Sequence, residues 1–176
     1  MIRRTMTTTR IMATLICLAM CAATADAKIS WGSLAMTGIE MEVQKKDSCY
    51  ALKVKMTSDT DRCMTESPTM LIKDGNGDIM ELKGELIKEG DEYGGSLSMQ
   101  MGAGIGISVP YTMKSSTAIF NISKEQLDKI IENGALKMRI ESRPKNYDKE
   151  WIYPHWLSRK LKKELKSMEE DIYKGF

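Results

Sequence analysis

Residues 48–58 read SCYALKVKMTS, and the alternation in this stretch decides the fold. The even positions from 50 to 56 are apolar and would share one face of an extended chain. Lys53 and Lys55 would lie on the opposite face. A period of two is typical of a strand that is buried on one face only. The stretch therefore predicts an antiparallel sheet with one apolar side.

The same alternation recurs along the first two thirds of the chain. It predicts further strands at residues 36–44, 69–73, 78–87, 96–102, 105–114 and 116–122. Glycine-rich turn signals separate them at residues 74–77, 89–91, 94–95 and 102–106. Short strands at this spacing predict an antiparallel β-sandwich or a partly open barrel.

Methionine is expected to fill much of the core, because the chain has only two phenylalanines. The inward positions of the predicted strands include Met36, Met56, Met80, Met138 and the row Leu97, Met99 and Met101. We interpret all of these residues as core.

Two helices complete the predicted fold. Ser123 followed by Gln126 has the spacing of a capping box, and Gly134 is placed to end the helix, after which residues 135–142 alternate as a strand. A second, amphipathic helix begins at about Pro154. The expected fold is mainly β, a β-rich α+β domain spanning residues 28–176.

The segment IFNISKEQLDKIIENGALKMRIES (residues 119–142), followed by NYDKEW (146–151) and a basic amphipathic tail, carries a resemblance. It resembles functionally uncharacterised small exported proteins of anaerobic Gram-negative bacteria, whose sheet domain ends in a strand, an S-x-E-Q-L helix, a glycine and a strand. The resemblance covers about residues 69–165 and implies a sandwich-like fold. It implies no active site.

Residues 1–27 have the pattern of a secretory signal peptide. Three arginines precede an apolar run of about thirteen residues, shorter than the ~20 that a spanning helix needs, and Ala25-Asp26-Ala27 forms a cleavage pattern. A lipid attached at Cys21, or a retained anchor, is the alternative. We expect a protein of the periplasm or cell envelope, or of the extracellular space, with no transmembrane segment in the mature chain.

Removing residues 1–27 leaves 23 basic and 23 acidic residues, so the mature chain is formally neutral. Neutrality removes the compositional support for nucleic-acid binding. Only Cys49 and Cys63 remain in an oxidising compartment. An extended strand over residues 49–57 would separate the two cysteines, so a disulfide needs a shorter or bent strand. The sequence leaves this bridge open.

DGNGD, residues 74–78, has the oxygen spacing of a calcium loop. An EF-hand loop needs glycine at its sixth position, where this chain has Ile79, and it needs flanking helices. Asp-Gly and Asn-Gly between alternating strands instead predict a hairpin turn. Calcium held by Asp74, Asn76 and Asp78 remains the alternative.

The aromatic run WIYPHW offers the best candidate binding surface. Trp151, Tyr153, His155 and Trp156 could stack on sugar rings or on anchor residues of a partner. Alternatively, the aromatic rings fasten the C-terminal helix to the sheet.

Catalytic signals are weak. His155 is the only histidine, and no serine has the G-x-S-x-G context of a hydrolase nucleophile. We therefore expect a non-catalytic binding or scaffolding module without a cofactor, whose partner is an unknown protein or glycan. A glycan- or calcium-binding module is one alternative, and a hydrolase using scattered carboxylates or His155 is another.

Overall fold

The structure, a computed structural model, describes residues 29–32, 37–46, 49–101 and 105–174. The strands are β1 (Ile29–Gly32), β2 (Thr37–Lys46), β3 (Cys49–Ser58), β4 (Cys63–Met64), β5 (Thr69–Asp74), β6 (Ile79–Met101), β7 (Ile105–Ile122), β8 (Ala135–Ile140), β9 (Ser142–Arg143) and β10 (Tyr147–Glu150). The helices are α2 (Lys124–Asn133) and α3 (His155–Lys174). The predicted signal segment, with Cys21, lies outside the described residues.

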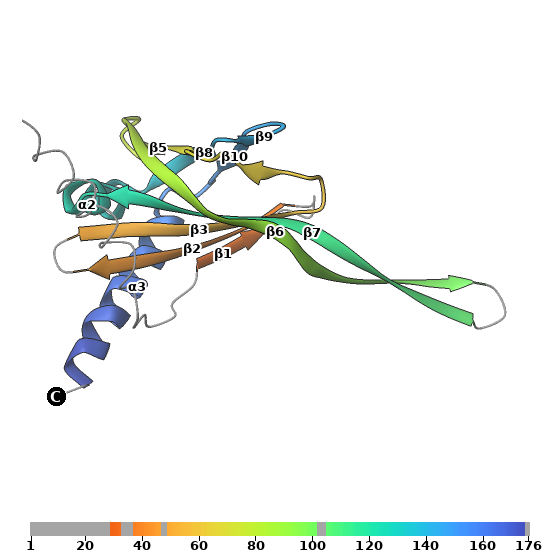
Figure 1. The fold of residues 1–176 in the computed structure, drawn as a ribbon. Helices are drawn as coiled ribbons and strands as arrows, with labels where there is room; N and C mark the ends of the chain where they lie inside the picture. The colour runs from red at the N-terminus through yellow and green to blue at the C-terminus, as the bar shows by residue number, and fades with distance from the viewer. Residues whose placement is uncertain (1–28, 33–36, 47–48, 102–104, 175–176) are drawn as a thin grey trace, which may run out of the picture.

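Eight strands form one antiparallel sheet in the order β1-β2-β3-β7-β6-β5-β8-β10. The sheet curls into a half-open barrel, with α2 and α3 on one side of it (Figure 1). Strands β4 and β9 pair separately. The prediction of a mainly β fold with one inserted helix and a C-terminal helix is confirmed.

The core lies between the inner face of the sheet and the two helices. On β3, Leu52, Val54 and Met56 are buried and the residues between them are partly exposed, as the alternation predicts. Methionine fills much of this core, and its buried members are Met41, Met56, Met64, Met70, Met80 and Met138. The expected use of methionine as core filler is confirmed at these positions.

Helix α2 begins with the predicted capping box. The Gln126 backbone N–H donates to Ser123 Oγ at 3.1 Å, and the Ser123 N–H donates to Gln126 Oε1 at 3.0 Å. Gly134 ends the helix with a φ of +79°, which favours glycine. A Cβ atom there would lie 2.6 Å from the Pro154 carbonyl oxygen, so this glycine also lets the start of α3 approach α2.

Helix α3 begins one residue after the predicted Pro154. It buries Leu157 and Leu161 against the core, with Leu165 and Met168 partly buried beside them. Helix α3 thereby closes over α2, β2 and β8, and completes the core.

Strands β6 and β7 are much longer than predicted. The glycines at 90 and at 94–95 were expected to end strands, but β6 runs through them and pairs with β7 from Gly84 to Met101. The register shifts between Leu86 and Lys88, and again between Tyr93 and Gly95. A Cβ atom on Gly94 would lie 2.4 Å from the Tyr111 ring. This glycine makes room for an aromatic ring across the ladder in a bulge, not a turn.

The distal parts of these two strands, residues 93–101 and 105–113, project beyond the rest of the sheet (Figure 1). We call this projection the arm. Pairing of β5 with β6 ends at Lys83, and pairing of β3 with β7 ends at Lys114. Leu97, Met99 and Met101 therefore lie on the arm, and their side chains, which were predicted to be core, are outside the described part of the chain.

Cys63 is a free, buried thiol. Strand β3 begins at Cys49 and stays extended for ten residues, which separates its ends by about 30 Å. Burial and the neighbouring Glu89 carboxylate raise the pKa of the Cys63 thiol. Cys63 is thus unpaired in this fold, and the side chain of Cys49 is outside the described part.

Candidate functional site

The DGNGD segment is the turn between β5 and β6, as predicted. Asp74 Oδ1 accepts hydrogen bonds from the backbone N–H groups of Asn76 at 3.0 Å and Asp78 at 2.9 Å. Asp74 Oδ2 accepts one from Asn133 Nδ2 at 2.9 Å. Both carboxylate oxygens therefore serve the turn and its contact with α2.

The electrostatics of Asp74 agree with this role. Burial by itself would raise the pKa of this carboxyl, but the hydrogen bonds from Asn133 and the turn backbone outweigh it and lower the pKa. Calcium would have to displace those bonds from a fully buried side chain. In the described part of the chain, no three His, Cys, Asp or Glu side chains are grouped to hold a metal.

The structure divides the predicted aromatic site. The rings of Trp151 and Trp156 stack with their centroids 6.5 Å apart and an interplanar angle of 20°, and both pack against the core. Lys160 Nζ lies 5.9 Å from the centre of the Trp156 ring. These two tryptophans fasten α3 to the sheet.

Tyr153 and His155 are exposed to solvent, unlike the two tryptophans. Tyr153 is 71% exposed, its neighbour Ile152 is 90% exposed, and His155 is also exposed. Tyr153 is thus the exposed aromatic ring of the predicted site, and a binding role for the four predicted residues stays a prediction.

Two buried glutamates lie where α3 crosses β2. Glu42 accepts hydrogen bonds from Lys53 Nζ and Gln44 Nε2, both at 3.2 Å. Burial raises the pKa of the Glu164 carboxyl, and the negative charge of Glu42 adds to the shift. Both residues are under 10% exposed, so neither carboxylate is open to a substrate in this structure. The hydrolase alternative gains no support from this pair.

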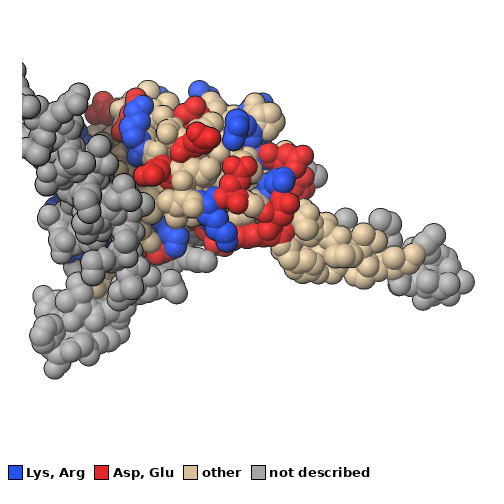
Figure 2. Space-filling view, viewed as in Figure 1, with Lys and Arg blue, Asp and Glu red and all other residues tan. Residues whose placement is uncertain are grey.

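The arm differs from the rest of the molecule in its charge. Between Glu92 and Lys114 the chain has 21 consecutive residues without a charged side chain. Lys, Arg, Asp and Glu side chains are spread over the visible face of the body in Figure 2, whereas the described part of the arm shows none. The boundary falls where the arm leaves the body.

The arm also exposes apolar side chains. Among the described residues, four of the eight large exposed hydrophobic side chains lie on it: Tyr93, Ile107, Val109 and Tyr111. Ile107 and Val109 are each 45% exposed. Contiguous exposed apolar surface on a small protein marks an interaction site more often than scattered residues do.

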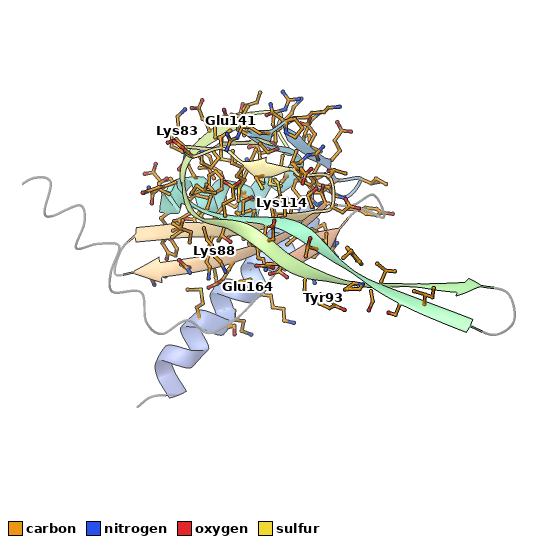
Figure 3. All side chains as sticks on the ribbon, turned by 45° about the vertical axis from the view of Figure 1, so that its right-hand side comes forward. Lys83, Lys88, Tyr93, Lys114, Glu141 and Glu164 are labelled. Atoms are coloured by element: carbon orange, nitrogen blue, oxygen red, sulfur yellow. The ribbon has the colours of Figure 1, made fainter. Side chains whose placement is uncertain are left out.

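Ion pairs surround the base of the arm. Lys114 Nζ lies 2.6 Å from Asp91 Oδ1, and Lys55 Nζ lies 2.5 Å from Glu92 Oε2. The hydrogen bond and charge of Asp91 raise the pKa of Lys114, and the bond from Lys55 lowers the pKa of Glu92. Figure 3 labels Lys114 within the body and Tyr93 at the start of the arm.

Sequence reasoning missed the arm because its glycines were interpreted as turns between short core strands. The charge-free run between Glu92 and Lys114 was the available signal. The charge-free run indicates a projecting hairpin only once β3 and β5 are known to end before the arm begins.

No helix in the described ranges combines the length and apolar character needed to cross a membrane. Comparison of the chain with known protein families, curated proteins and solved structures finds no match. The resemblance to exported proteins of anaerobic Gram-negative bacteria therefore stays a prediction.

Proposed function

We propose that this protein is an exported, non-catalytic module of the cell envelope, and that the arm is its binding element. The observation that carries the proposal is the 21-residue charge-free segment, whose described part projects from a charged body. The body holds the arm in place, because β6 and β7 continue from the arm into the core.

The low intrinsic stability of the arm and its tendency to associate favour a binding role for it. A two-stranded ribbon outside a core is at best marginally stable in water by itself. Its exposed apolar row (Tyr93, Ile107, Val109 and Tyr111) and its unpaired strand edges favour unwanted association. Natural proteins usually suppress such association with charged residues on edge strands. Retention of such a segment without any charge is consistent with an apolar partner that covers it.

The alternatives have narrower support. Glycan binding rests on the exposed Tyr153, since Trp151 and Trp156 pack against the core. Calcium binding would require Asp74 to give up its hydrogen bonds. A hydrolase would need access to buried carboxylates or chemistry at the exposed His155.

The proposal is tested by cell fractionation of two proteins expressed in a Gram-negative host. One is the full chain, and in the other an Asn-Gly turn replaces residues 93–112 between the paired residues Glu92 and Met113. The full chain should fractionate with the envelope, and the shortened chain should appear in the soluble fraction.

The control is the thermal unfolding midpoint of both exported proteins, which should agree within a few degrees because the shortened chain keeps the core. Equal envelope association of the two folded proteins would refute a binding role for the arm.

A further inference from the structure

We propose that the arm enters the hydrocarbon layer of a lipid bilayer, with residues 93–101 and 105–113 inside it. This inference rests on the proposed function and names the partner of the same element. Three features carry it: the length of the charge-free segment, the position of the charges that bound it, and the arrangement of its apolar residues.

The length matches a bilayer. The arm contributes nine residues from β6 and nine from β7. A strand that crosses a membrane needs about 9–11 residues, and nine extended residues reach about 30 Å, close to the thickness of the hydrocarbon core. A protein groove sets no such length and usually brings a polar rim with hydrogen bonds.

The charges stop at the same level on both strands. Asp91 lies opposite Lys114 in the ladder, and Glu92 lies opposite Met113. The last charged residues of the two strands therefore form one boundary across the hairpin, held by the Asp91–Lys114 and Lys55–Glu92 ion pairs. A charge boundary of this form suits the interface between headgroups and acyl chains, where ionisable groups must stop.

Apolar residues alternate with small or polar ones at positions 96–101 and 105–109. In the register, Leu97 lies opposite Val109 and Met99 opposite Ile107, so both residues of each pair are apolar. The intervening pairs, Ser98 with Ser108 and Gln100 with Gly106, are small or polar. Directly opposed residues share a face of a ladder, so one face of the hairpin is apolar and the other is not.

The outer edges of the arm set a further requirement. In the described sheet, β3 and β5 do not reach the arm, so its outer backbone N–H and C=O groups have no strand beside them. Such groups cannot remain unpaired in hydrocarbon. Inserted arms of neighbouring copies must therefore pair edge to edge, and membrane binding should bring copies together.

A local fluorescent label tests the insertion. The label needs a single reactive cysteine, so Cys49 is replaced by serine, and Cys63 is buried. A nitrobenzoxadiazole dye is then attached at Val109→Cys on the arm. Attachment at Lys83→Cys, an exposed position on the body, is the control. The exported forms are mixed with vesicles of phosphatidylethanolamine and phosphatidylglycerol. The dye at position 109 should shift to the blue and be quenched by nitroxide-labelled lipids, and the dye at position 83 should not.

A matched pair of charge substitutions gives the second readout. Val109→Asp places a carboxylate in the apolar row and should raise the vesicle concentration for half-binding roughly tenfold or more. Ile79→Asp changes an equally apolar residue, 67% exposed in the body, and should leave vesicle binding unchanged.

The outcomes separate this inference from the proposed function. If vesicles leave the emission at position 109 unchanged while envelope association still requires the arm, the partner is a protein and the lipid proposal fails. If vesicles have no effect and the arm forms dimers in buffer by sedimentation, the apolar row belongs to a second copy, which equally overturns it.

Discussion

Asp74 is the single residue on which the β5–β6 turn depends most. An asparagine there would keep one acceptor for the turn but would set its own amide against that of Asn133. We expect Asp74→Asn to lower the free energy of unfolding by about 1–3 kcal/mol at pH 7, because a buried polar group loses its partner. Chemical denaturation measures this difference.

The contribution of Asp74 to the free energy of unfolding should depend on pH in a defined direction. Because the folded state lowers the pKa of Asp74, its contribution is present above the unfolded pKa of about 3.9 and is lost as the pH falls through the folded pKa. The difference between wild type and Asp74→Asn should therefore shrink in acid. The exposed Asp78 is the control, because Asp78→Asn keeps the backbone N–H that donates a hydrogen bond to Asp74. Equal effects of the two substitutions would contradict the role of Asp74.

Glu164 should behave in the opposite sense. Burial raises its pKa in the folded state, so ionisation costs stability as the pH rises from about 4.3, the unfolded value, through the folded pKa. Glu164→Gln removes this charge in the contact between α3 and β2 (Figure 3 labels Glu164 on α3). The variant should have a higher unfolding midpoint at neutral pH, and the gain should vanish in acid. The exposed Glu132→Gln serves as control, and a gain of equal size there would contradict the burial argument.

At the scale of elements, the β5–β6 turn must fit closely against the end of α2. A Cβ atom on Gly75 would lie 2.0 Å from the backbone oxygen of Asn133, which cannot rotate away. We expect Gly75→Ala to destabilise the fold by about 1–3 kcal/mol, as overpacking does. Gly90 is the matched control, because a Cβ atom there meets nothing within 4 Å. Thermal unfolding of the two alanine variants compares them, and equal midpoints would show that α2 does not depend on this contact.

Local patterns predicted most elements because their causes are local. The alternation of β3 and the capping box of α2 involve residues that are neighbours in the chain. The short strands β1 and β10 were missed, since four residues are too few for a clear period. The length of β6 was missed for a different reason. Whether Gly94 makes a turn or a bulge depends on Tyr111, which lies across the ladder and distant in sequence.

The candidate site was predicted less well than the fold. Trp151 and Trp156 were recognised as possible ligand contacts or as anchors, and only their packing against the core favours the anchor. The arm becomes visible only when the ends of β3, β5 and β7 are compared in space. A charge-free run indicates a buried strand and a projecting one equally well, so tertiary structure had to decide.

At the scale of the whole molecule, the protein consists of a charged body with a closed core and one uncharged arm without a core of its own (Figure 2). The body ties its eight-stranded sheet together with two helices, so its amides should exchange slowly. The arm has pairing on one side of each strand only, and its outer amides should exchange rapidly in water.

Amide hydrogen exchange of the exported protein, read by mass spectrometry with and without phospholipid vesicles, tests the central claim most directly. We predict that vesicles protect residues 93–101 and 105–113 and leave the exchange of β2, β3 and β8 unchanged. Protection that is absent from the arm, or that appears in the body instead, would contradict the claim that the arm is the element that binds.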